Sequence, residues 1–143
     1  MRDRTSLLGL FLAFTTTAVC VSACDGGGPD DGLTAPTLLS PDDGAVLDNG
    51  CSDRSNPKEW AFDWSDVSNA EAYHFFVTKE GAQTASINRS NQRTSEYSES
   101  SPSFIVDRNR FDWFWRVRAR VDGTWSPWSE ERSFDVEPLN TDC

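Results

Sequence analysis

The chain has 143 residues, the length of a single domain, and carries 13 Lys plus Arg against 23 Asp plus Glu, a formal net charge of -10. So acidic a chain lacks the basic footprint that nucleic-acid phosphates require, and no nucleic-acid partner is expected. Its one histidine, His74, leaves little for a histidine-based metal site or for Ser-His or Cys-His catalysis. We therefore expect no metal, no cofactor, no catalytic residue and no enzymatic activity.

Residues 1–23 are predicted to be a lipoprotein signal peptide. Two arginines precede an apolar stretch, residues 7–21, which is shorter than the roughly 20 residues of a membrane-spanning helix. The stretch ends in Val21-Ser22-Ala23-Cys24, which resembles the lipobox of bacterial lipoproteins. The resemblance implies cleavage before Cys24, lipidation of its sulfur and anchoring to a membrane of the cell envelope. The alternatives are an ordinary secretory signal cut at Ala23 and an uncleaved anchor.

Residues 24–34 are predicted to be a flexible tether. Residues 25–32 read DGGGPDDG, a composition of Gly, Pro and Asp that cannot pack. The folded domain is placed at 35–138 and a short tail at 139–143. Asp25 stands directly after the lipidated cysteine and leaves the choice between the inner and outer membrane open.

Alternation of apolar and polar residues with a period of two predicts β-strands. In chain order these are 37–39, 45–47, 60–64, 73–77, 113–121 and 132–136, with weaker strands at 84–87 and 103–106. No segment keeps a helical period beyond two turns. About seven short strands with frequent turns predict an all-β sandwich in which each sheet has one wet face.

Several of these segments resemble a fibronectin type III domain. Residues 36–44 match the opening P-x-L-L-S-P-x-x-G of bacterial members, Trp64 the tryptophan that closes the second strand, and Tyr73 the tyrosine that opens the third. The resemblance implies a seven-stranded fibronectin type III-like (immunoglobulin-like) sandwich. Residue 113 departs from the pattern: it is Trp where the sixth strand has the tyrosine of a "tyrosine corner". An indole N–H can only donate, so the corner survives in altered form or is absent.

Two cysteines remain once Cys20 is lost with the signal and Cys24 carries lipid. Cys51 and Cys143 form an even pair in an oxidising compartment, so we predict a disulfide between them. The alternative is two free thiols. Two thiols and one distant histidine do not favour a zinc site.

Residues 125–129, W-S-P-W-S, resemble the Trp-Ser-x-Trp-Ser box of cytokine-receptor type III domains. Three arginines occupy alternate positions of the preceding strand, so they point the same way, and a guanidinium over an indole face is attractive by about 0.5–2 kcal/mol. We predict a stacked structural ladder made of Arg116, Arg118, Arg120, Trp125 and Trp128. The alternative is an exposed platform for sugars or for an acidic partner.

The leading interpretation is a lipid-anchored, non-catalytic binding or structural module that contacts proteins or glycans at the cell envelope. Its partner would meet the loops at one end of the sandwich, or the face carrying His74 and Phe76. The alternative is a carbohydrate-binding module that exposes Trp60, Trp125 or Trp128, and burial of those indoles decides between the two.

Overall fold

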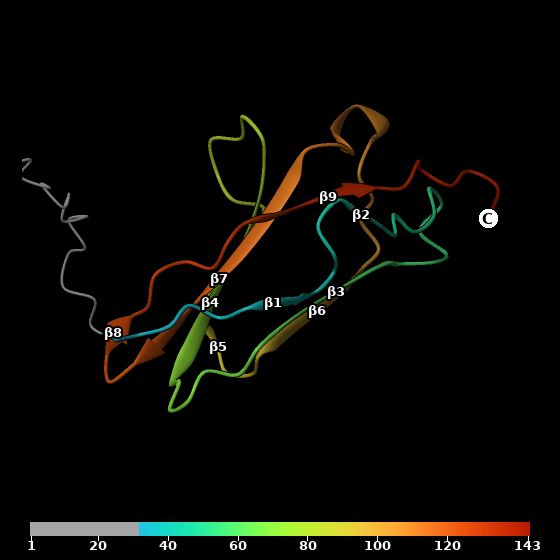
Figure 1. Cartoon of the computed structure of the whole chain (residues 1–143). Helices are drawn as coiled ribbons and strands as arrows, with labels where there is room; N and C mark the ends of the chain where they lie inside the picture. The colour runs from blue at the N-terminus through green and yellow to red at the C-terminus, as the bar shows by residue number, and fades with distance from the viewer. Residues whose placement is uncertain (1–31) are drawn as a thin grey trace, which may run out of the picture. The chain divides into compact units, whose positions relative to one another are not determined.

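The computed structural model describes residues 32–143 (Figure 1). The predicted signal peptide, the lipidation site Cys24 and most of the tether 24–34 lie outside the described residues. Within residues 32–143 no helix has the length and apolar character to span a membrane.

Two β-sheets form the domain, as Figure 1 shows. The first sheet has the strand order β1 (Leu38–Ser40), β3 (Lys58–Trp64), β6 (Glu96–Ser101). The second has the order β2 (Ala45–Leu47), β9 (Arg132–Val136), β7 (Trp113–Val121), β4 (Ala72–Lys79), β5 (Ile87–Gln92), and β8 (Thr124–Trp125) also pairs with β7. Neighbouring strands are antiparallel except β2 and β9, which run parallel.

The predicted fold class is confirmed: the domain is an all-β, fibronectin type III-like sandwich. Its strand count is close to the predicted seven, and the excess has a physical origin. The turn at Pro41 to Gly44 carries the first extended segment from one sheet to the other, so β1 and β2 are separate strands. β8 is a two-residue strand after the tight turn at Asp122 and Gly123, both of which have positive φ.

Both weak strand predictions are wrong in position. β5 and β6 occupy 87–92 and 96–101 instead of 84–87 and 103–106. Each strand is the last in its sheet and mostly polar, so β5 carries no apolar alternation to reveal it. Residues 103–106 form no strand because the Ile105 N–H donates to the Asn49 side chain at 2.7 Å.

Aromatic residues fill the space between the sheets. The predicted inward sets of three strands are buried: Trp60, Phe62 and Trp64 on β3, Tyr73, Phe75 and Val77 on β4, and Trp113, Trp115, Val117, Ala119 and Val121 on β7. Rings meet edge-on or stacked, with Phe62 and Trp115 at 5.1 Å and Trp64 and Phe75 at 5.5 Å between centroids. This rigid core fixes which side chains of β4 and β7 project outward.

The corner at the start of β7 survives in altered form. The Trp113 indole N–H donates to the Asn109 carbonyl at 2.8 Å. Asn109 ends the short 3-10 helix η1 (Asp107–Asn109), so the bond ties the entry of β7 to the turn before it.

The structure joins Cys51 and Cys143, the predicted disulfide pair, with 6.1 Å between their Cα atoms and a sequence separation of 92. A backbone bond from Ser52 N to the Asn140 carbonyl at 2.9 Å runs beside it. Closing a loop of this length removes about 4–5 kcal/mol of entropy from the unfolded chain in the chain-entropy account.

Candidate functional site: an arginine–tryptophan ladder

Arginines line the outer face of β7. Alternate residues of this strand are buried, which leaves Arg116, Arg118 and Arg120 half-buried on the opposite, solvent-facing side of the sheet. Each arginine side chain therefore lies on the outer side of the sheet. Successive arginines are two residues apart, a spacing of about 6.8 Å along an antiparallel strand.

The segment after β8 runs beside β7 and is held by two serines. Ser126 N donates to the Ala119 carbonyl at 2.8 Å, and its Oγ accepts from Ala119 N at 3.0 Å. Ser129 repeats the arrangement with Val117, at 2.8 and 3.0 Å. Each serine hydroxyl thus takes the place of a neighbouring strand's carbonyl, and both serines are buried. The repeat fixes the two tryptophans over the arginines.

The structure brings all five predicted ladder residues together. Arg118 lies between the two indoles, with its guanidinium carbon 4.5 Å from the Trp128 ring and 4.8 Å from the Trp125 ring. Arg116 covers the Trp128 ring at 4.6 Å, and Arg120 covers the Trp125 ring at 5.5 Å. Both indoles are therefore enclosed between cations.

Two further members come from β4, His74 and Phe76, which the sequence places on one outward face but not within the ladder. The His74 ring lies 4.9 Å from Trp128 and 5.7 Å from Trp125. Phe76 lies 5.3 Å from the Arg116 guanidinium. The reason is register, because β4 pairs with β7 so that His74 faces Arg118 and Phe76 faces Arg116. Alternation placed both residues outward, and the register was the missing information.

The hydrogen bonds of His74 define its tautomer. Arg118 Nη2 lies 3.2 Å from His74 Nδ1, and a guanidinium has only donors, so Nδ1 accepts. The other ring nitrogen, Nε2, lies 2.6 Å from Asn88 Oδ1 and carries the proton. His74 thus contacts Arg118 from the side.

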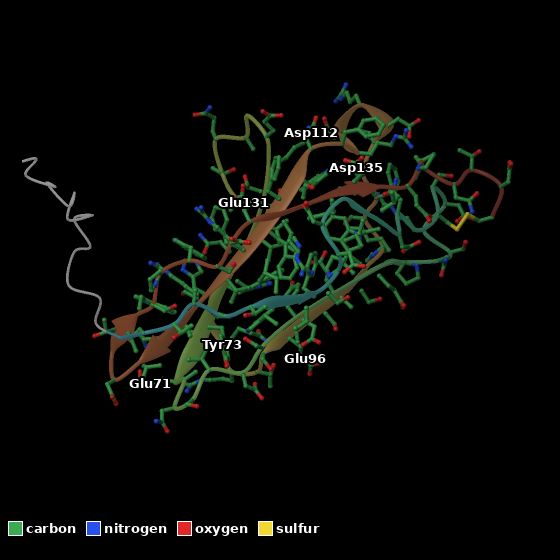
Figure 2. All side chains as sticks on the ribbon, viewed as in Figure 1. Glu71, Tyr73, Glu96, Asp112, Glu131 and Asp135 are labelled. Atoms are coloured by element: carbon green, nitrogen blue, oxygen red, sulfur yellow. A yellow bond between two sulfur atoms is a disulfide. The ribbon has the colours of Figure 1, made fainter. Side chains whose placement is uncertain are left out.

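Carboxylates close the two ends of the ladder. Glu131 lies 3.8 Å from Arg116, and Glu71 lies 3.1 Å from Arg120 (both acids are labelled in Figure 2). All four side chains are about one-third or more exposed, so each pair contributes little to stability. Arg118 has no carboxylate within 4.0 Å among residues 32–143.

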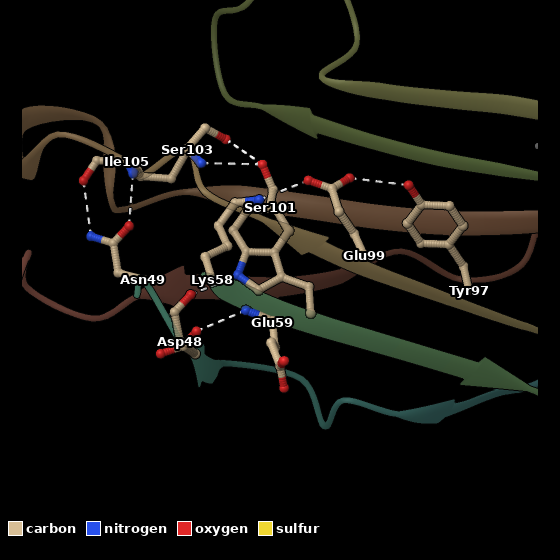
Figure 3. A network of polar contacts seen from close by, with 10 residues as sticks. Asp48, Asn49, Lys58, Glu59, Tyr97, Glu99, Ser101, Ser103 and Ile105 are labelled. Carbon is tan, nitrogen blue, oxygen red and sulfur yellow. Dashed lines mark hydrogen bonds and ion pairs between the residues drawn. The ribbon is translucent and has the colours of Figure 1, made fainter. Parts of the chain in front are cut away.

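A second polar cluster lies between the sheets, at the β6 edge (Figure 3). Lys58 faces inward and is only 4% exposed; its Nζ bonds Glu99 Oε1 at 2.7 Å, and the Tyr97 hydroxyl donates to Glu99 Oε2 at 3.0 Å. Burial raises the pKa of Glu99, but the hydrogen bond and charge of Lys58 outweigh it, so this pKa lies below its usual 4.5. Burial, then the bond to Glu99, raises the pKa of Tyr97. The cluster seals the sandwich edge.

The remaining carboxyls with lowered pKa are exposed and lie apart from this cluster. Bonds from Ser133 lower the pKa of Asp43, and bonds from Ser55 lower that of Asp53. Asp43 lies in the β1–β2 turn and Asp53 in the loop before β3, whereas Glu99 lies on β6. The three carboxyls therefore do not form a shared site. Asp53 also lies near Cys51 and Cys143, but both sulfurs are in the disulfide and offer no thiolate to a metal.

The alternative function, a sugar-binding platform, requires an exposed indole face on Trp60, Trp125 or Trp128, and in this arrangement these indoles are covered. Trp60 is buried in the core at 3% exposure. Trp125 has arginines at 4.8 and 5.5 Å and Trp128 at 4.5 and 4.6 Å, so neither presents the open face on which a sugar ring stacks.

The described residues thus form a two-sheet β-sandwich that carries an arginine–tryptophan ladder with a Trp-Ser-Pro-Trp-Ser segment. Among solved structures, an Fn3-like protein from Clostridium thermocellum is similar at 20% identity, with a TM-score of 0.45, over 75% of this chain and 96% of that one. A structure described as a myokine is similar at 15% identity, with a TM-score of 0.46, over 72% and 96%. No family model matches the chain, and no curated protein matches it.

Proposed function

We propose that this chain is a lipid-anchored protein of the cell envelope whose fibronectin type III-like domain is a non-catalytic binding or structural module. Lipid on Cys24 holds it to the membrane on the periplasmic side or at the cell surface, and residues 24–34 hold the domain away from the bilayer. Its partner is a protein or a glycan, met by the outer face of the sheet that carries the ladder.

The Cys51–Cys143 disulfide is the observation that carries this proposal. Disulfides persist in oxidising compartments, and the pairing agrees with an export signal that ends at Cys24. The non-catalytic part is supported by the carboxyls with shifted pKa, each of which is accounted for by a structural partner.

Membrane partition of two cysteine variants tests the anchor. Cys24→Ser is expected to move the chain from the membrane pellet to the soluble fraction, because no acyl chain can attach. Cys20→Ser is the matched control and is expected to stay in the pellet, with mass spectrometry finding acyl chains on an N-terminal Cys24. An unmodified, soluble wild-type chain would overturn the proposal.

A further inference from the structure

Arg118 is a half-buried cation without a counter-charge in the described part of the chain. The two flanking arginines have Glu131 and Glu71, whereas the side-chain polar partner of Arg118 among residues 32–143 is His74, at 3.2 Å. The Nε of Arg118, like that of Arg116, is buried without a hydrogen-bond partner among residues 32–143. A cation withdrawn from water in this way favours an anion beside it.

Several hydrogen-bond donors of the ladder are unused within residues 32–143. A guanidinium has five N–H donors, of which the structure uses one nitrogen, Nη2, on His74. The indole N–H groups of Trp125 and Trp128 have no acceptor within residues 32–143, and neither nitrogen is among the buried unpaired ones. The proton of His74 is already given to Asn88. A guanidinium with free N–H donors and no counter-charge among residues 32–143 matches an oxyanion, whose oxygens only accept.

We propose that Arg118 is the centre of an oxyanion-binding site that takes a carboxylate, sulfate or phosphate group. The proposal rests on the proposed function, because it gives that binding face a ligand class. Stacking between the two indoles pre-orients the guanidinium, so little freedom is lost when the anion binds.

The flanking arginines extend the site along β7. Their ion pairs with exposed carboxylates are weak, so a ligand with several anionic groups can displace Glu131 and Glu71 and engage Arg116 and Arg120. The oxyanion therefore comes either from a small free ion or from a polymer that carries such groups in series.

Indole N–H resonances measure binding directly in the purified full chain in neutral detergent. The six tryptophans give internal controls, because Trp60, Trp64, Trp113 and Trp115 are buried in the core. Inorganic phosphate is titrated at constant ionic strength against chloride. The Trp125 and Trp128 resonances are expected to shift in a saturable way while the four core resonances stay in place. No saturable shift with either phosphate or dextran sulfate would overturn the proposal.

Two polymers and two variants complete the test. Dextran sulfate shifting the same resonances at tenfold lower sulfate concentration supports an extended ligand, and equal potency supports a small ion. Neutral dextran producing the shift would overturn the proposal. Arg118→Gln is expected to weaken phosphate binding about tenfold or more, as loss of a charged hydrogen bond implies, and Arg108→Gln, at an exposed position on η1 outside the ladder, is expected to keep it. Equal loss in both variants would contradict a site centred on Arg118. If the binding tests fail while Cys24 is still lipidated, the oxyanion site is overturned and the proposed lipid-anchored module is not.

Discussion

The Arg132 guanidinium donates to the Leu38 carbonyl at 2.7 Å, and this bond joins the two sheets. Arg132 belongs to β9 and Leu38 to β1, so the contact crosses the sandwich at its open side. A second nitrogen of the same side chain reaches the carbonyls of Leu39 at 3.1 Å and Pro41 at 2.7 Å. One side chain thus supplies donors to two carbonyls of β1 and to one in the turn that follows it.

Arg132→Met is therefore expected to lower the free energy of unfolding by about 2–3 kcal/mol, because charged hydrogen bonds are lost and carbonyls are left without a donor. Arg108→Met, on the exposed face of η1, is the control and is expected to change it by less than about 0.5 kcal/mol. Urea unfolding followed by fluorescence measures both, and equal values would contradict the bridging role.

Trp113→Phe is expected to destabilise the domain more than Trp115→Phe, although Trp115 is the more deeply buried of the two. The first change removes the bond to Asn109 and leaves its carbonyl unpaired. The second removes an indole N–H that is buried without a partner. Both lose the same volume, so the difference in unfolding free energy isolates the hydrogen bond, about 1 kcal/mol. The reverse order would show that packing alone decides.

Glu99 makes stability depend on pH at the acidic end. Its folded pKa lies below 4.5, so the ionised form contributes stability above the unfolded pKa, and this is lost as pH falls through the folded pKa. At neutral pH, Glu99→Gln is expected to be destabilising because it leaves Lys58 buried and unpaired. Its deficit relative to wild type is expected to shrink as the pH falls below that range.

Glu59→Gln is the matched control for this pH series, since Glu59 is exposed on the outer face of β3 next to Lys58. Its unfolding free energy is expected to follow the wild-type pH profile. A Glu99→Gln deficit that stays constant through the acidic range would show that the carboxylate charge is not what Lys58 requires.

Ser126→Ala is expected to cost about 1–3 kcal/mol, because the buried Ala119 N–H loses its acceptor. Pro127→Ala, on the exposed residue between the two pairs, is the control. Thermal unfolding measures stability, and the near-ultraviolet circular dichroism of the stacked indoles reports the ladder. Unchanged stability would mean that water replaces the serine hydroxyl.

Alternation predicted the strands whose inner residues are aromatic. In β3, for example, large apolar side chains at every second position show which face of the strand is buried: Trp60, Phe62 and Trp64. The same parity places Lys58 inward, on the face of Trp60 two residues further on. The mostly polar sequences of β5 and β6 show no clear apolar alternation, so their positions could not be predicted from it. Both are edge strands, which need no apolar face. The position of His74 within the ladder depends on the register between β4 and β7, which no local pattern contains. Asn49 is similar: it bonds the Ile105 and Glu137 carbonyls from a loop that reads as an ordinary turn.

The disulfide also changes how the domain responds to mechanical load. A pull between the amino-terminal side of Gly32 and any attachment at Cys143 travels through residues 32–51 and then crosses the sulfur bridge. The chain between 52 and 142 lies on the bypassed branch and carries no tension while the bridge holds. β3 to β9, with the ladder, would keep their shape under stretching that peels away β1 and β2.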